Sequence, residues 1–304
     1  MGIIGEQIKD MSKESLTQQE SHKGGKSLSD LNYYFMSNAL TNDIPICRYM
    51  NFDAFLNILE GKYWVQRREF FKDAKEKGEI PLAKRMVLRY VGENAPSPNT
   101  QLIKAESEEK ELKYQLLKRS KHLLTSCWSL DNGEDYLMWK SYTDKCGVCI
   151  RTTIGELLEA IKFKDDGYVI ICSPMFYEGV QIKDSITSMI MSKERFYSSE
   201  NEIRFYFLKN NHFLHEDLEN LDNARFEALL EETIEDEAHT CETEKGNKKG
   251  EIFHVNPNFI NSIILSPFIL PSSVDYMKKL LQKNYPELLG KKNMIKESEI
   301  KINE

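Results

Sequence analysis

The segment from Glu200 to Leu208 alternates polar residues with large apolar ones, and it restricts the fold more than any other part of the sequence. A two-residue period is typical of a β-strand, because successive side chains point to opposite faces of a sheet. It predicts three polar residues on one face and three core residues on the other: Glu202, Arg204 and Tyr206 against Ile203, Phe205 and Phe207. The polar face is then either a solvated outer face with cross-strand pairs or the wall of a cleft.

Short strands and short helices alternate along the rest of the chain. The patterns predict strands at 46–50, 63–66, 123–129, 148–152, 168–172, 175–177, 260–266 and 295–302. They predict helices at 52–60, 136–142, 155–161, 183–193, 216–244 and 272–283. Because the helical links are irregular in length, we expect an α+β fold rather than a doubly wound sheet.

The length of 304 residues allows one large domain with insertions or two smaller domains. We expect a polar N-terminal arm and lead-in helix over 1–40 and a single α+β domain over 41–304. Within that domain we expect a charged helical insertion at about 67–121 and an acidic helical insertion at about 210–250. A hydrophobic content of 40% and an aromatic content of 11% exclude a disordered chain.

No apolar run approaches the roughly 20 residues of a membrane span, and the first residues lack the basic and apolar regions of a secretory signal. We therefore expect a cytoplasmic protein with no membrane partner. The six cysteines lie mostly in apolar strand-like runs, which suits buried free thiols better than disulfides. Cys146-Gly-Val-Cys149 has the spacing of a metal or redox motif but lacks a second ligand pair, so no metal is expected.

Two stretches of the chain carry strongly unbalanced charge. Between Lys62 and Arg89 there are nine basic and four acidic residues, with aromatic residues such as Trp64 interleaved. This pattern fits either a groove that binds nucleic acid or a charged helix with one solvated face. Between Glu216 and Glu244 there are twelve acidic residues and one basic residue, a pattern that would repel nucleic acid.

Several short motifs keep a recognisable order along the chain. They are Arg48-Tyr49, Ser126-Cys-Trp-Ser129, Leu137-Met-Trp139-Lys-Ser-Tyr142, Gly147-Val148, a Tyr-containing strand at 176–178, Glu200-x-Glu202-x-Arg204 and the tail Lys296-Glu-Ser-Glu-Ile. Over roughly residues 44–302 this set resembles a bacterial family similar to the AbiGi-type abortive phage infection proteins. More remotely, it resembles the ADP-ribosyltransferase superfamily, which carries a triad of Arg or His, Ser and Glu.

The superfamily resemblance implies a split, mixed or antiparallel sheet with helical insertions, and NAD as a substrate without a metal. It implies that Glu202 is the catalytic carboxylate and that Glu200 orients the acceptor. Carried over in the same way, the residues that bind NAD are Arg48, Tyr49, Ser126, Ser129, Trp139, Tyr142 and Arg204. Arg48 would hold the NAD, one of the two serines would support the nicotinamide-side ribose, and the aromatic residues would pack the nicotinamide. The motif reads Ser-Cys-Trp-Ser where the superfamily has Ser-Thr-Ser, which leaves the choice of serine open.

The implied function is that of an NAD-dependent mono-ADP-ribosyltransferase toxin of anti-phage defence, held by an antitoxin protein. Some defence enzymes of this superfamily modify nucleic-acid bases, and the basic stretch favours nucleic acid as acceptor, with RNA favoured over DNA. A protein target is an alternative. Another is a non-catalytic binding or sensor protein, in which Glu200, Glu202 and Arg204 form a structural ion-pair ladder. The acidic stretch is then either a docking surface for the antitoxin or a solvated helix.

Overall fold

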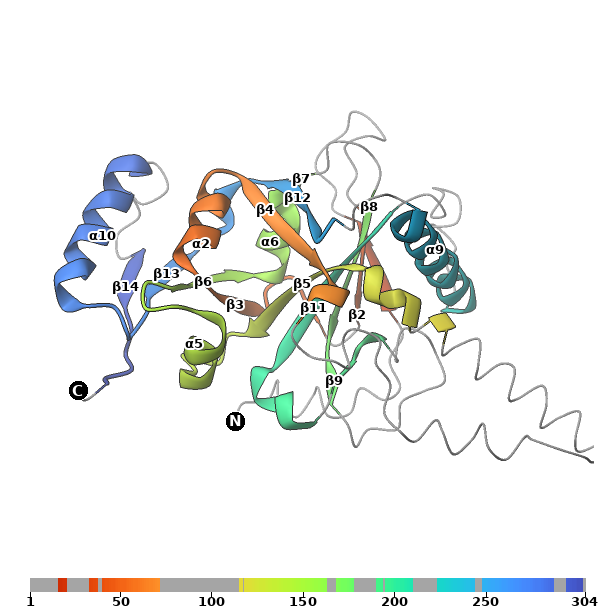
Figure 1. Ribbon diagram of the computed structural model, residues 1–304, viewed down its shortest axis with the longest axis horizontal. Coiled ribbons are helices and arrows are strands. Elements are labelled where there is room, and N and C mark those ends of the chain that lie inside the picture. The colour runs from red at the N-terminus through yellow and green to blue at the C-terminus, as the bar shows by residue number, and fades with distance from the viewer. Residues whose placement is uncertain are drawn as a thin grey trace, which may run out of the picture.

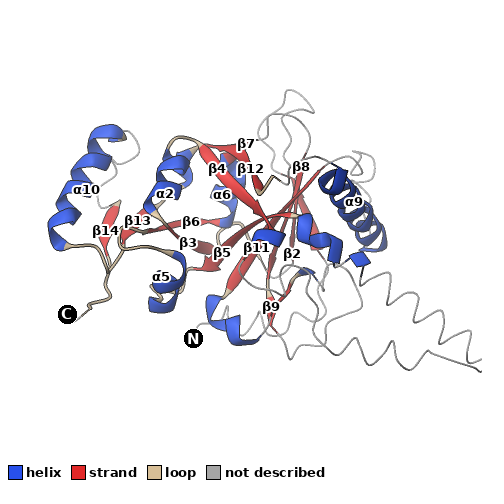
Figure 2. Cartoon of the chain, viewed as in Figure 1, coloured by secondary structure: helices blue, strands red, loops and turns tan. Residues whose placement is uncertain are grey.

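The computed structural model describes residues 16–20, 33–37, 40–71, 115–116, 118–162, 168–177, 190–193, 195–209, 223–243, 248–286 and 294–302. Within these residues, twelve strands join in one sheet that runs through the centre of the molecule (Figure 1). Helices lie on both faces of this sheet and at its ends (Figure 2).

The sheet has a main path of nine strands and a three-stranded branch. In spatial order the main path is β1 (Leu16–Glu20), β2 (Tyr33–Ser37), β8 (Tyr168–Pro174), β11 (Glu202–Lys209), β5 (Leu124–Leu130), β3 (Pro45–Met50), β6 (Val148–Thr153), β13 (Ser262–Leu265) and β14 (Ile295–Glu297). The branch contains β4 (Lys62–Arg67), β12 (Gly250–Val255) and β7 (Ile161–Lys162). A separate pair consists of β9 (Phe176–Tyr177) and β10 (Ser192–Lys193).

Strand directions make the sheet mixed. The pairs β2 with β8 and β13 with β14 are parallel, and the other neighbours in the sheet are antiparallel. A mixed sheet with helices between its strands is compatible with the predicted α+β class.

The sheet divides at β5. One end of β5 pairs with β3 only through Leu130 and Ser129, and the other end pairs with β4 only through Thr125 and Leu124. The middle of β5, from 126 to 128, therefore has no strand partner on that edge. β3 and β4 diverge there, which leaves a gap between two arms of the sheet.

Helices cover both faces of the sheet. The larger core lies under α2 (Phe52–Leu59), α6 (Ile154–Ala160) and α10 (Pro271–Asn284), which all contribute buried residues to it. On the other face, α5 (Tyr136–Tyr142) packs over one end of the strands and α9 (Asn223–Thr243) over the other. Short 3-10 helices are η3 (Arg68–Phe70), η4 (Ser120–His122), η5 (Arg195–Glu200) and η6 (Pro257–Phe259).

Local sequence explains several of these boundaries. In α2, Phe55, Ile58 and Leu59 recur at helical spacing and are buried. The helix ends before Gly61, whose φ of +78° lies in the left-handed region that glycine adopts without a steric penalty. At the start of α6, the Thr153 hydroxyl and the Glu156 side chain form a reciprocal capping box.

Three predictions of local structure need correction. The lead-in helix expected within 1–40 is not found in the part of this range that the structure describes, which contains β1 and β2 instead. Helix α10 begins at Pro271 after Leu270, and not behind a serine cap. Of the helix predicted at 183–193, the last two residues form the strand β10. Residues 183–189 lie outside the described residues.

The acidic helix is an integral part of the fold. Phe226, Leu229, Leu230 and Ile234 of α9 are buried against the sheet, while Glu232, Glu235 and Asp236 are exposed. The buried Glu237 accepts a hydrogen bond from Arg67 of β4 at 3.0 Å. Residues 210–222 and 244–247 of the predicted acidic insertion, and most of the predicted charged insertion, at 72–114, lie outside the described residues. No described helix is both long and apolar enough to cross a membrane.

Candidate functional site

The polar face of β11 is buried. The predicted division of faces is confirmed, because Ile203, Phe205 and Phe207 lie in the larger core. On the opposite face, Glu202 is only 5% exposed and Arg204 is fully buried. Of the two alternatives for this face, the solvated outer face is therefore wrong, because α5, η5 and α9 pack on that side.

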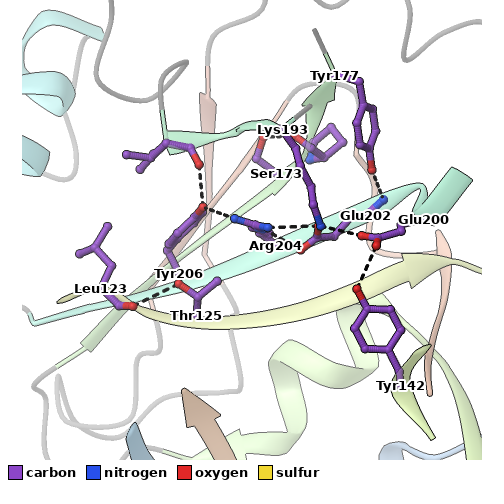
Figure 3. A network of polar contacts seen from close by, with 12 residues as sticks. Leu123, Thr125, Tyr142, Ser173, Tyr177, Lys193, Glu200, Glu202, Arg204 and Tyr206 are labelled. Carbon is purple, nitrogen blue, oxygen red and sulfur yellow. Dashed lines mark hydrogen bonds and ion pairs between the residues drawn. The ribbon is translucent and has the colours of Figure 1, made fainter. Parts of the chain in front are cut away.

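Four charged residues meet at the start of β11, and we call them the Glu202 cluster: Lys193, Glu200, Glu202 and Arg204 (Figure 3). Arg204 donates from Nε to Glu202 Oε1 at 2.6 Å and from Nη2 to Glu202 Oε2 at 3.2 Å. Lys193 Nζ donates to Glu202 Oε2 at 3.0 Å and to Glu200 Oε2 at 2.6 Å. Both oxygens of Glu202 are thus bound by cationic donors.

These cations keep the Glu202 carboxyl ionised. Burial alone would raise its pKa, but the positive charges of Arg204 and Lys193 outweigh burial and lower the pKa from 4.5 to about 2. The Cys127 thiol of β5 adds a hydrogen bond that acts in the same direction. At neutral pH the site therefore holds a fixed negative charge in a position nearly closed to water.

Two tyrosines and a left-handed turn border the cluster. The Tyr142 hydroxyl of α5 donates to Glu200 Oε1 at 2.9 Å, while the residue as a whole is 46% exposed. Burial of the hydroxyl, and then the charge of Glu200, raise the Tyr142 pKa, so this hydroxyl keeps its proton at neutral pH. The Tyr177 hydroxyl accepts from the Glu202 backbone N–H at 2.9 Å. Asn201 has a φ of +43°, a conformation that asparagine tolerates better than most residues.

One row of side chains crosses four adjacent strands on the Glu202 face. Cys47 of β3 lies opposite both Arg151 of β6 and Ser129 of β5, and Ser129 lies opposite Glu202. Side chains directly opposite one another point to the same face. Since strands are about 4.8 Å apart, the backbone of Arg151 lies roughly 14 Å from that of Glu202. Ser129, and not Ser126, therefore shares the face with the carboxylate.

Arg48 lies on the opposite face, in the gap where β3 leaves β5. Its Nη1 donates to Tyr63 Oη and to Ser126 Oγ, each at 3.2 Å, and the two hydroxyls are themselves hydrogen-bonded. The guanidinium lies 5.6 Å from the Tyr63 ring centroid and 5.9 Å from that of Trp128. Arg48 forms no ion pair with any residue that the structure describes. The predicted site residues are thus divided between two faces of the sheet.

Tyr49 and Trp139 pack between α5 and the sheet. Their rings meet edge to face, with centroids 4.9 Å apart, and Trp139 is fully buried. Trp139 Nε1 donates to Glu134 at 3.0 Å, and Tyr49 Oη accepts from the Asp135 N–H at 2.9 Å. Neither ring offers a face to a ligand in this conformation. Of the three aromatic residues assigned to a nicotinamide pocket, only Tyr142 is exposed.

Sequence reasoning assigned no site role to Lys193, Tyr177 or Arg151. Lys193 was expected in a helix, and no periodic pattern marks the two-residue strand that carries it. Tyr177 lies in a predicted strand, but its contact with the backbone of β11 depends on tertiary packing. Arg151 becomes visible as a member of the row only once the register of β3 with β6 is known.

The described residues offer no assembled metal site. No group of three or more His, Cys, Asp or Glu side chains within them is placed to hold a metal ion. All six cysteines are free thiols, of which Cys47, Cys149, Cys172 and Cys241 are buried. The predicted predominance of buried free thiols is confirmed.

The chain matches no protein-family model, no curated protein and no solved structure.

Proposed function

We propose that the protein is an NAD-dependent mono-ADP-ribosyltransferase that transfers ADP-ribose to nucleic acid, with RNA favoured over DNA, and releases nicotinamide. The observation that carries this proposal is the ionised, nearly buried Glu202, which lies directly across from Ser129 on the neighbouring strand. The resemblance in the order of motifs extends the proposal to a toxin of bacterial anti-phage defence, acting in the cytoplasm and held by an antitoxin.

The chemistry requires one fixed negative charge. The bond between the ribose C1′ and the nicotinamide nitrogen breaks with its electron pair going to the nicotinamide, which leaves as a neutral base. The ribose acquires oxocarbenium character, which a carboxylate in a dry site stabilises. The acceptor nucleophile then bonds to C1′ and releases its proton to water. Glu202 supplies the charge, the Ser129 hydroxyl positions the ribose, and the exposed ring of Tyr142 supplies a surface for the nicotinamide.

Arg48 would hold the diphosphate. Support comes from its unusual position, since it is a half-buried guanidinium whose hydrogen-bond partners are neutral hydroxyls. A planar guanidinium suits a diphosphate because it donates in pairs. Arg48 and Glu202 lie on opposite faces of the sheet, so for both to contact one NAD molecule the diphosphate must lie at the gap where β3 and β4 diverge beside β5. This requirement is specific to the proposal and can be tested.

A second candidate function follows from the same cluster. Because Arg204 and Lys193 occupy both oxygens of Glu202, the cluster is also a complete structural ion-pair ladder, as a non-catalytic binding or sensor protein would have. Catalysis requires one oxygen to be released. Lys193 is the partner to be displaced, because it binds through a single nitrogen that Glu200 also holds, whereas Arg204 binds both oxygens of Glu202.

The deciding experiment follows transfer of label from NAD carrying a labelled adenylate to RNA, DNA and cell protein. We expect label in RNA with the wild type, and at least a hundredfold less with Glu202→Gln. Arg48→Ala should raise the KM for NAD more than it lowers kcat. Label in protein alone would move the proposal to the protein-target alternative.

A matched control separates catalysis from folding. Glu237 of α9 is also buried and paired with an arginine, but it lies outside the Glu202 cluster. We expect folded Glu237→Gln to transfer label at the rate of the wild type. No label from antitoxin-free wild type in any pool would exclude the transferase and favour the ion-pair ladder.

A further inference from the structure

The outward side of the β4 and β12 pair has exposed side chains and an unusual composition. Three cross-strand rows make up this surface, which we call the outer β4–β12 face: Gln66 with Gly250, Trp64 with Ile252, and Lys62 with His254. The intervening residues of both strands turn inward to the core or to buried polar partners. Trp64 is 42% exposed and Ile252 is 60% exposed. No described helix lies over these side chains.

The Trp64 indole is held in place by the strand beside it. A Cβ atom at Gly250 would lie 2.7 Å from Cζ2 of Trp64, so the ring rests directly against the glycine backbone. A side chain at this position would push the ring away. The indole therefore presents its other side outward in a fixed position. A fixed, exposed aromatic ring is the element on which unpaired bases stack, and it loses little conformational entropy on binding.

The charge around the indole is opposite to that of the whole chain. The protein has a net charge of −7, yet Lys248 and Lys249 immediately precede β12 beside Gln66, and both are exposed. Neither forms an ion pair with a residue that the structure describes. At the other end of the face lie His254 and Lys62, of which Lys62 is bound to Glu60 at 2.8 Å. Two exposed lysines thus lie at one end of an apolar platform, and a lysine paired with Glu60 lies at the other.

We propose that the outer β4–β12 face binds single-stranded nucleic acid, with a base stacked on Trp64 and phosphates bound by Lys248 and Lys249. An open sheet surface with a ring in its centre suits an unpaired strand better than a duplex, because the bases of a duplex are already stacked. The inference rests on the proposed function only in treating this strand as the acceptor for ADP-ribose. Binding itself needs neither NAD nor Glu202.

Tryptophan fluorescence gives a direct test. The chain has three tryptophans, and Trp128 and Trp139 are buried, so Trp64 is the one accessible to a ligand. We expect oligouridylate to quench this fluorescence and oligouridylate binding to weaken by about 5- to 150-fold in Trp64→Ala, since stacking contributes about 1–3 kcal/mol per base. Trp64→Phe should retain most of the binding. Tyr276→Ala, at an exposed aromatic residue of α10, is the matched control and should bind as the wild type does.

The salt dependence of binding tests the lysines separately. Replacing Lys248 and Lys249 by alanine should reduce the slope of log K against log salt concentration by about 1.4, since each phosphate contact to a single strand contributes about 0.7. The matched control replaces Lys279 and Lys283, two exposed lysines of α10, and should leave the slope unchanged.

Three results would overturn the proposal. They are no binding by folded wild type, equal binding by Trp64→Ala, and a photocrosslinker at position 66, on the same face, that captures protein and no RNA in cells. Glu202→Gln separates the two proposals. If this variant binds oligouridylate but neither it nor the wild type transfers label, the surface stands and the transferase fails. If the wild type labels RNA without quenching at Trp64, the transferase stands and the surface fails.

Discussion

Replacing Glu202 by Gln should destabilise the fold in a way that depends on pH. The variant keeps the shape of the side chain but leaves Arg204 and Lys193 buried without a carboxylate. The Glu202 pKa falls from 4.5 to about 2 in the folded state, which corresponds to about 3 kcal/mol at neutral pH. The same figure is at the lower end of the roughly 3–5 kcal/mol lost when one partner of a buried ion pair is removed.

The sign of the pH dependence follows from the direction of the shift. Because the folded-state pKa lies below the unfolded value, the stabilisation is complete above about pH 5 and is lost as the pH falls from 4.5 towards 2. Wild type and variant should therefore differ by about 3 kcal/mol at pH 7 and converge across that interval.

Urea unfolding at pH 7, 5, 4 and 3, followed by the fluorescence of the buried tryptophans, measures this difference. Glu299→Gln is the control, since its exposed carboxylate forms no ion pair with a described residue, and it should stay within about 0.5 kcal/mol of wild type. Equal stability of wild type and Glu202→Gln at neutral pH, or a difference that does not change with pH, would refute the reasoning.

Three further predictions concern the fold around the site. Leu230→Ala should cost about 2–5 kcal/mol in urea unfolding, because the side chain is fully buried between α9 and the sheet; a cost below about 1 kcal/mol would mean that α9 is a detachable insert. Trp139→Ala should cost about 3–5 kcal/mol by the same measurement, whereas a small cost would show that the ring is not part of the core. At Asn201, substitution by Gly should be nearly neutral and substitution by Val should cost about 1–2 kcal/mol, because only glycine adopts a positive φ freely; equal melting temperatures for the two variants would contradict the left-handed conformation.

Several strands of the central sheet were predictable because their buried apolar residues form runs or alternate with polar residues in the sequence. β5, β6 and β11 all lie within a residue or two of their expected positions. β2 was not predictable, because Tyr33–Ser37 contains no alternation and its pairing with β8 joins distant parts of the chain. The acidic helix was predicted to be an insertion because most of its residues are charged or polar. Only a few apolar residues of α9 pack in the core, and the sequence does not distinguish them from those of a solvated helix.

The residue types of the site were predictable, but their arrangement was not. The period of β11 placed Glu202 and Arg204 on one face, as the structure has them. The faces taken by Arg48, Ser126 and Ser129 depend on how three separate strands align, and a shift of one residue reverses every side chain of a strand. The alignment of β3, β5 and β11 with one another cannot be read from a local sequence pattern. The sequence therefore could not decide between Ser126 and Ser129.

The branching of the sheet at β5 also bears on how the protein reaches its folded state. β3 and β4 precede β5 in the chain, while β11 follows it much later, so the strand is completed only by segments from both directions. Such long-range pairings slow folding, because chain entropy is lost before the contacts compensate for it. During synthesis, the edge of β5 that pairs with β11 stays unpaired until β11 has left the ribosome. A chain whose synthesis stops before β11 lacks both the second neighbour of β5 and Glu202. Incomplete synthesis therefore cannot yield a complete sheet that carries the Glu202 carboxylate.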